Sequence, residues 1–206
     1  MKVASPTEMR AWPRGERGFT LVELMVVVAV LAILAVLAAP SLRDMILMQR
    51  LRAINAQLVT DMQAARGEAI NRRQLLRVNF RNNSSQTCYT LYLALGNDLR
   101  CNCTGGAGGA CTDSGTEEIR TVSVPRSTGV TTLPALATVP VNYAFAFDPV
   151  TGGLLEIPSD DEPRPMALAE LETRVDANRR LRTQINTAGR VSVCSPVTAV
   201  MQGAAC

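Results

Sequence analysis

Cysteines and one glutamate are the residues of this chain whose types and positions point to chemistry. The six cysteines all lie from Cys88 onward, whereas Glu23 stands before a stretch, Leu24 to Leu42, that has no charged side chain. The sequence contains no histidine, which excludes Ser-His-Asp and Cys-His nucleophilic catalysis and every histidine-containing metal site. It also has no cofactor fingerprint. We therefore predict a protein that is not an enzyme and has no cofactor.

The even number of cysteines, all outside the apolar stretch, predicts disulfide bonds formed in an oxidising compartment. Four of them are central in the sequence and two lie near its end: Cys88, Cys101, Cys103, Cys111, Cys194 and Cys206. The central four allow three pairings, among which the sequence does not choose. A structural zinc site is the alternative, but Cys101 and Cys103 are closer together than zinc ligands usually are, and we predict no metal. There is no Cys-x-x-Cys motif of the kind that redox catalysis uses.

The N-terminal segment has three interpretations. A cleaved secretory signal would have a shorter apolar run, and the late cut available here, after Ala39, would leave Pro40 as the first residue. A plain membrane anchor fits better, since about 20 apolar residues span a bilayer. Neither accounts for Glu23, because an unpaired charge within a bilayer costs about 3 kcal/mol. Cleavage between Gly18 and Phe19 would create a free amine four residues before Glu23 and so supply its partner.

The residues at this junction resemble the class III signal of type IV pilins and type II secretion pseudopilins. The matching run is Gly18-Phe19-Thr20-Leu21-Val22-Glu23-Leu24. The resemblance implies cleavage by prepilin peptidase after Gly18 and N-methylation of Phe19. It also implies that Glu23 aligns an incoming subunit with the growing filament. Pro40 lies where such pilins commonly carry a proline that bends the helix.

One long helix is expected to begin at Phe19 and to end near Asn71–Arg73, because helix-forming residues fill it and no glycine interrupts it before Gly67. Its first half, residues 19–46, is apolar all round and is predicted to lie in the membrane or the filament core. Its second half has one apolar stripe, suited to packing on a sheet. The stripe consists of Leu51, Ile54, Leu58, Met62, Ala65 and Ala69.

Short extended runs follow the helix and predict an α+β fold, in which the helix packs on an antiparallel sheet. The predicted strands are Gln74–Phe80, Thr87–Leu95, Glu117–Val124, Asn142–Phe147, Arg182–Asn186 and Arg190–Cys194. Residues Met166–Ala177 are expected to form a short surface helix, after an acidic loop at Ser159–Pro165. The glycine-rich run Thr104–Ala110 is interpreted as a flexible loop, since it lacks the Gly-Lys-Ser/Thr ending of a phosphate-binding loop.

The end of the helix narrows the resemblance to the GspH/FimT family of minor pseudopilins and minor pilins. The motif residues are Asp61, Gln63, Ala65, Arg66, Glu68, Ala69, Ile70 and Arg72. Phe147–Gly152 and Ile185–Cys194 support the match, and Arg66 and Glu68 are interpreted as surface charges of the helix. The resemblance implies a minor subunit that primes or caps assembly of a type IV pilus or a type II secretion pseudopilus. Because pilins often close a C-terminal loop with a disulfide, it also favours a bond between Cys194 and Cys206.

The resemblance further implies partners, a location and a division of the chain. The partners are other pilins, met through the N-terminal helix, together with prepilin peptidase and an inner-membrane assembly platform. The chain would have a leader at 1–18, a transmembrane or filament-core helix at 19–46 and a periplasmic head at 47–206. It would cross the inner membrane once before it enters a pilus or pseudopilus.

DNA uptake is the second functional interpretation, because some members of the family bind DNA through a C-terminal Gly-Arg-x-Arg motif. Here Gly189-Arg190-Val191-Ser192 keeps the first arginine and lacks the second. Arg179, Arg180 and Arg182 could complete a basic patch for phosphate contacts. No aromatic residue follows Phe147 to stack on bases, so a solvated strand edge that carries arginines is the favoured interpretation.

Overall fold

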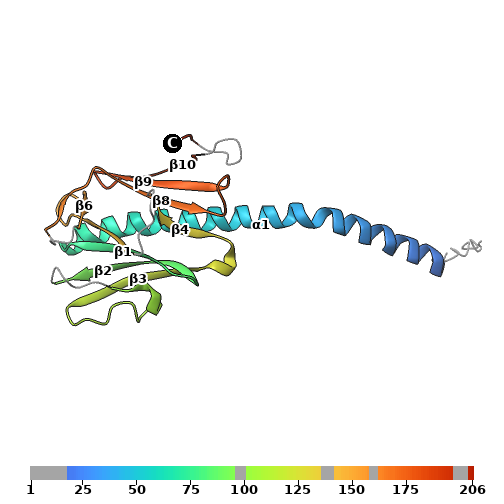
Figure 1. Ribbon diagram of the computed structural model, residues 1–206, viewed down its shortest axis with the longest axis horizontal. Coiled ribbons are helices and arrows are strands. Elements are labelled where there is room, and N and C mark those ends of the chain that lie inside the picture. The colour runs from blue at the N-terminus through green and yellow to red at the C-terminus, as the bar shows by residue number, and fades with distance from the viewer. Residues whose placement is uncertain (1–17, 96–100, 136–141, 158–161, 197–203) are drawn as a thin grey trace, which may run out of the picture. The chain divides into compact units, whose positions relative to one another are not determined.

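The computed structural model describes residues 18–95, 101–135, 142–157, 162–196 and 204–206 (Figure 1). The predicted leader, apart from Gly18, lies outside these ranges, as does part of the predicted acidic loop. For residues 38–40 the structure describes the helical backbone but not the side chains. The chain forms two compact units, Met1–Leu42 and Arg43–Cys206.

Helix α1 spans Leu21–Arg72, close to the predicted bounds. It ends because Arg73 adopts a left-handed conformation with φ of 53°. The backbone N–H groups of Arg73 and Gln74 donate to the carbonyls of Ile70 and Ala69, at 3.3 Å each. These two bonds form a Schellman motif, with an arginine at the position that glycine usually occupies.

Six antiparallel strands form the first sheet, in the order β3-β2-β1-β5-β6-β7. Their bounds are β1 Leu76–Asn82, β2 Gln86–Ala94, β3 Thr116–Pro125, β5 Asn142–Phe147, β6 Leu154–Glu156 and β7 Arg164–Pro165. The register places Val78 of β1 opposite Leu91 of β2 on one side and Phe145 of β5 on the other. Apolar residues of three strands therefore line the same face of the sheet.

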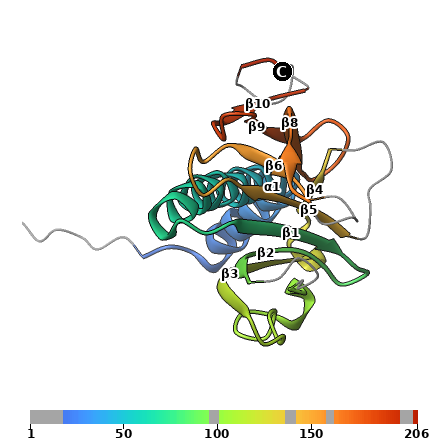
Figure 2. The same cartoon turned by 90° about the vertical axis from the view of Figure 1, so that its left-hand side faces the viewer.

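Four antiparallel strands form the second sheet, in the order β10-β9-β8-β4 (Figure 2). Their bounds are β4 Thr131–Pro134, β8 Leu168–Arg174, β9 Arg180–Asn186 and β10 Val191–Cys194. A hydrogen bond of 3.1 Å from the Thr132 backbone N–H to the Thr87 hydroxyl joins β4 to β2. The two sheets are thus tied together at a buried pair of threonines.

The expected surface helix at Met166–Ala177 is wrong, because β8 occupies this segment as a strand. Ala169, Leu171 and Thr173 are buried, so every second residue faces the core. The glutamates between them lie beside arginines of β9. Burial and cross-strand pairing therefore override the helix-forming tendency of alanine, leucine and glutamate here.

The second half of α1 lies between the two sheets (Figures 1 and 2). Most of its apolar stripe shares one buried cluster with both of them, whereas Leu51 lies in a second cluster with Val130. The helix contributes Leu58, Met62, Ala65 and Ala69, the first sheet contributes Phe80, Tyr89, Phe145 and Phe147, and the second contributes Ala169, Leu171 and Ile185. The structure confirms the predicted α+β fold with a helix packed on antiparallel sheet and disulfide bonds.

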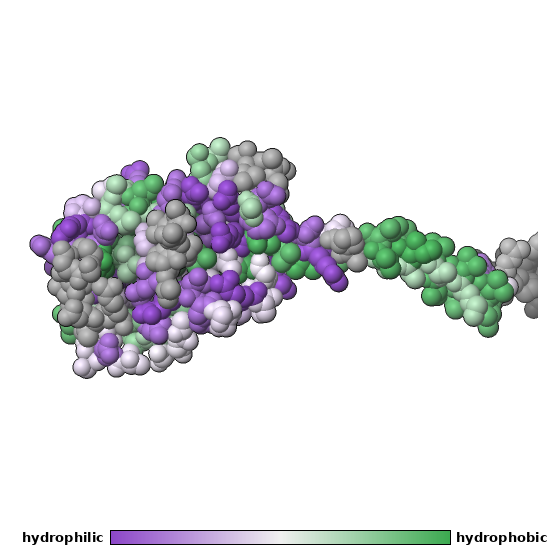
Figure 3. Space-filling model, viewed as in Figure 1, coloured by the Kyte–Doolittle hydropathy of each residue, from purple (hydrophilic) through white to green (hydrophobic). Residues whose placement is uncertain are grey.

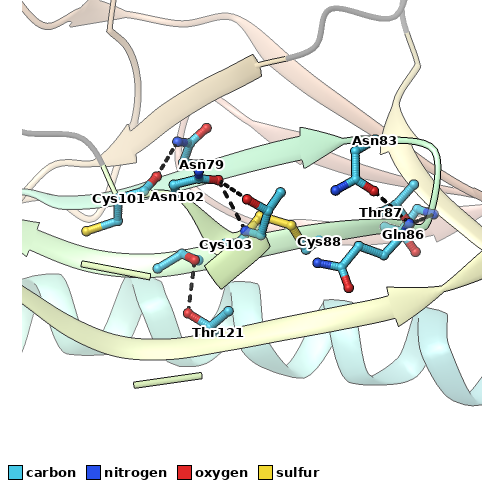
Figure 4. The surroundings of a disulfide bond; sticks show 12 residues. Asn79, Asn83, Gln86, Thr87, Cys88, Cys101, Asn102, Cys103 and Thr121 are labelled. Carbon is cyan, nitrogen blue, oxygen red and sulfur yellow. Dashed lines mark hydrogen bonds between the residues drawn. A yellow bond between two sulfur atoms is a disulfide. The ribbon is translucent and has the colours of Figure 1, made fainter. Parts of the chain in front are cut away.

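A glycine-rich segment covers the outer face of the first sheet and is tied to it covalently (Figure 4). Cys88 of β2 is bonded to Cys103, and Cys101 is bonded to Cys111. Asn79 of β1 donates from its side-chain amide to the Cys101 carbonyl at 2.7 Å. The short 3₁₀ helix η1, Cys103–Gly105, begins this segment, and a second, η2 at Arg126–Thr128, follows β3.

Glu118 of β3 fixes the far side of the glycine-rich segment. Its carboxylate accepts the backbone N–H groups of Gly108 and Ala110, at 2.9 and 3.1 Å. With all four central cysteines in disulfides, none is a thiolate that could bind zinc. The segment predicted as a flexible loop is therefore held at both ends and at its centre.

The third disulfide joins Cys194, at the end of β10, to Cys206. The tail also forms a parallel bridge between Ser195 and Ala205. The chain end is thereby fastened beside β10, an edge strand of the second sheet.

Candidate functional site

The start of α1 combines a helix cap with the residues of the predicted cleavage site. Phe19 is 82% exposed, and a Cβ atom added at Gly18 would meet nothing within 4 Å. The Thr20 hydroxyl accepts the backbone N–H of Glu23 at 3.2 Å, in the Thr-x-x-Glu order of a capping box. Glu23 thus lies in the first turn, where a carboxylate also favours the positive end of the helix dipole.

The first part of α1 exposes an apolar surface along its described length (Figure 3). The large apolar side chains from Phe19 to Leu37 are each 50–82% exposed. Among the described residues, no single helix is long and apolar enough to cross a membrane. The stretches Leu21–Leu37 and Ser41–Arg72 together meet that requirement by length and composition alone. Pro40 lies between them, among the residues whose side chains are not described, so the bend remains a prediction.

In the second unit, one corner of the head is built around Arg66. The Arg66 Nε donates to the carbonyl of Gly152, in the turn between β5 and β6, at 3.1 Å. Gly189, in the turn between β9 and β10, lies against the same side chain, since an added Cβ would come within 2.9 Å of Arg66 Cδ. Arg66 is therefore a specific contact and not only a surface charge of the helix, which corrects the prediction from sequence.

The two turns that meet Arg66 are each held by side-chain hydrogen bonds. In the first, the Asp148 carboxylate accepts the backbone N–H groups of Val150 and Thr151, at 3.0 and 2.7 Å. The Thr151 N–H, more than any other group, holds the pKa of Asp148 below its usual value. In the second, the Asn186 side chain accepts the Arg190 N–H at 2.9 Å. Both glycines have positive φ values, 67° at Gly152 and 70° at Gly189, which favour glycine.

The structure brings together the three segments that carry the resemblance to GspH/FimT: the helix end, Phe147–Gly152 and Ile185–Cys194. Sequence reasoning recognised each segment but missed that they form one corner. One signal was available, because an arginine in the helix motif and a glycine in each of the other two suit a close approach of three backbones. Glu68, in contrast, forms an ordinary i,i+4 pair with Arg72 at 2.6 Å.

Asp61, another residue of the helix motif, is almost fully buried and has two partners. Its carboxylate accepts the Tyr89 hydroxyl at 2.7 Å and lies 3.2 Å from the Arg120 Nε. Burial above all, and then the hydrogen bond and charge of Asp61, raise the pKa of Tyr89 well above its ordinary value of 10.0. Burial likewise raises the pKa of Tyr143 to about 12.

Tyr89→Phe is expected to lower the free energy of unfolding near neutral pH by about 1–3 kcal/mol, because the buried Asp61 carboxylate loses a donor. Because the pKa of Tyr89 is raised in the folded state, protonated Tyr89 stabilises the fold fully below pH 10.0, and this stabilisation falls as pH rises further. The wild type should therefore lose about 1.4 kcal/mol more per pH unit above 10 than the variant does. Urea unfolding in detergent at neutral and alkaline pH measures both effects.

Tyr143→Phe is the matched control, since its raised pKa also contributes to the alkaline loss but its hydroxyl has no bond to Asp61 among the described contacts. This variant should show a smaller alkaline slope with little change at neutral pH. Equal alkaline slopes for the wild type and Tyr89→Phe would contradict the assignment.

Three of the four arginines proposed for DNA contact are paired with carboxylates. Arg179 lies 2.8 Å from Asp44 and 2.7 Å from Asp176. The other two lie beside glutamates of β8, with Arg180 3.4 Å from Glu172 and Arg182 3.5 Å from Glu170. Arg190 is exposed, and within the described part of the chain no carboxylate pairs with its side chain. The structure therefore does not gather the four into one free basic patch.

Two protein-family models match this chain, one over its N-terminal segment and one over its head. Residues 13–39 match the model of the prokaryotic N-terminal methylation motif, and residues 55–189 match that of type II transport protein GspH. A solved structure of the Pseudomonas aeruginosa type IV minor pilin FimU is similar at a TM-score of 0.48 and 16% identity, over 75% of this chain and 95% of that one. No curated protein sequence is similar enough to count as a match. Since the GspH match covers most of the head, the chain belongs to the GspH family.

Proposed function

We propose that this protein is a minor pilin or pseudopilin that primes or caps assembly of a type IV pilus or a type II secretion pseudopilus. One observation carries the proposal: the large apolar side chains of residues 19–37 are exposed along the described length of the helix. Such a surface is stable in lipid or against the apolar helices of other subunits. The two family matches, on one chain, support the same role.

The parts of the chain have separate tasks in this proposal. Prepilin peptidase removes residues 1–18 and leaves a methylated Phe19. Residues 19–46 anchor the protein in the inner membrane and later join the filament core, with Pro40 bending the helix. Residues 47–206 form a periplasmic head, closed by its disulfides. An inner-membrane assembly platform moves the subunit between membrane and filament.

Deleting the gene for this protein should reduce the number of filaments on the cells about tenfold or more, because a priming subunit sets how many filaments begin. The subunit itself should be found in filaments purified by shearing, as a small fraction of the major subunit. Electron microscopy and immunoblotting measure these quantities, and complementation with the wild-type chain is the control. A normal filament number together with absence from the purified filaments would refute the role in a type IV pilus.

DNA capture is the second candidate function, and one observation favours it: Arg190 is exposed without a carboxylate partner among the described residues. Phosphate contacts need charge and reach rather than a folded pocket. The pairing of Arg179, Arg180 and Arg182 with carboxylates weakens this candidate. An oligonucleotide titration, included in the experiment below, tests DNA capture.

A further inference from the structure

A groove of about 400 Å³ opens at the corner built around Arg66. It is lined by Gln63, Arg66, Gly189, Arg190 and Val191, which come from α1 and from the turn and strand after β9. None of these five residues is acidic. Two arginines and one glutamine therefore line a space to which its lining residues contribute no carboxylate.

The two arginines of the groove have donors to spare. Arg66 uses Nε on the Gly152 carbonyl, and the described residues offer no carboxylate to either Arg66 or Arg190. A guanidinium group carries five N–H donors in a planar fork that matches a carboxylate or a phosphate. The groove is thus suited to an anion.

The groove is also held in shape before anything binds. The Arg66 side chain is held by Gly152 and lies against Gly189, and the backbone of Arg190 is fixed by the bond from its N–H to the Asn186 side chain. A preformed site loses less conformational entropy when a ligand enters. Apolar contact with Val191 would add to the binding of a side chain that carries its charge on a short stem.

The residues around the groove favour a single carboxylate over a nucleic acid as its ligand. A DNA strand carries a phosphate on every nucleotide, so binding it calls for a continuous basic surface. Beyond the groove, Arg180 and Arg182 of β9 are paired with Glu172 and Glu170 of β8, so their charges are already engaged and offer less to a second phosphate. One isolated pair of guanidinium groups instead fits one acidic side chain.

We propose that this groove receives an aspartate or glutamate side chain from a neighbouring filament subunit. The inference rests on the proposed function, which places other subunits next to this one. The pair would form at the head and would add to the contacts of the N-terminal helices. It would help to select which subunit stands beside this one, because charge complementarity suppresses wrong partners.

Photo-crosslinking in the native cells tests the proposal directly. Gln63 of the full-length chain is replaced by p-benzoylphenylalanine, and Gln57, exposed on α1 outside the groove, is replaced in a control. The Gln63 variant should give one adduct to another pilin subunit, at a peptide that contains aspartate or glutamate, and the control should not. The absence of such an adduct in filaments that contain the variant would overturn the proposal.

Charge reversal provides the second arm. Arg190→Glu should lower the amount of the protein in filaments about tenfold, and Arg190→Gln somewhat less, whereas the exposed Arg52→Glu should have no effect. Replacing the crosslinked acidic residue of the partner with arginine should restore incorporation of Arg190→Glu. Normal incorporation of Arg190→Glu, or a failure of this rescue, would overturn the proposal.

DNA binding in the groove is the remaining alternative. It is tested by titration of the full-length protein in detergent with a single-stranded oligonucleotide, over a range of salt concentrations. Tight binding that Arg190→Ala abolishes would assign the groove to DNA and overturn the carboxylate. The proposed function fails separately, because it requires the wild-type chain in filaments whether or not the groove is occupied.

Discussion

Replacing Glu23 with alanine is expected to leave cleavage after Gly18 intact and to lower incorporation into filaments by about 100-fold. Under the proposed function, cleavage after Gly18 leaves a charged amine at Phe19, four residues before Glu23, at the end of an exposed apolar helix. An unpaired charge within a bilayer costs about 3 kcal/mol, and every 1.4 kcal/mol changes an equilibrium about tenfold. Immunoblots of sheared filaments and of whole cells measure incorporation and processing.

The structure supplies a competing role for Glu23 and a control that separates the two. The Thr20 hydroxyl accepts the Glu23 N–H, so Glu23 also belongs to a helix cap. Thr20→Ala removes the cap and keeps the carboxylate, at a cost of about 1 kcal/mol in helix stability. Glu23→Gln removes the charge at nearly constant shape. If pairing with the amine is the role, Glu23→Gln should behave like Glu23→Ala, and Thr20→Ala should incorporate almost normally. Full incorporation of Glu23→Ala would rule the pairing out.

Gly189→Ala is expected to be the most damaging conservative change in the head. At φ of 70° an alanine costs about 1–2 kcal/mol, and its Cβ would collide with the Gly152 carbonyl and approach Arg66 within 2.9 Å. Crowding of this kind adds about 1–3 kcal/mol. The variant should lose about 3 kcal/mol of stability, or about 10 °C in melting temperature, which calorimetry of the full chain in detergent measures.

Gly67→Ala is the matched control one residue from Arg66. Gly67 lies in α1 without a positive φ, and an added Cβ would meet nothing within 4 Å. Alanine there should raise stability by about 1 kcal/mol through its higher helix propensity. If the two variants melted at the same temperature, Gly189 would not be closely packed against Gly152 and Arg66.

The sequence predicts the helix and much of the first sheet because their patterns are local. Leu58, Met62, Ala65 and Ala69 recur at helical spacing, and Tyr143, Phe145 and Phe147 alternate as in a strand. Prediction from local patterns fails for strand β8, because its alanine, leucine and glutamate residues favour a helix. Only the neighbouring arginines of β9 and the burial of Ala169 and Leu171 make it a strand.

The functional residues, too, could be predicted from the sequence only where a local pattern marks them. Phe19 and Glu23 are recognisable because a charge at the start of an apolar run is costly and requires an explanation. The contact between Arg66 and Gly152 joins residues 86 positions apart, and no local pattern encodes it. The sequence likewise does not predict the bonds Cys88–Cys103 and Cys101–Cys111, because the pairing of the central cysteines depends on which strand the glycine-rich segment covers.

Mass spectrometry of the subunit recovered from purified filaments tests the central claim most directly. We expect an N-terminal peptide that begins with methylated Phe19 and contains Thr20 and Glu23. The protein should also carry its cysteines as disulfides. A subunit that retained Met1, or that began at Pro40 after a cut behind Ala39, would contradict it.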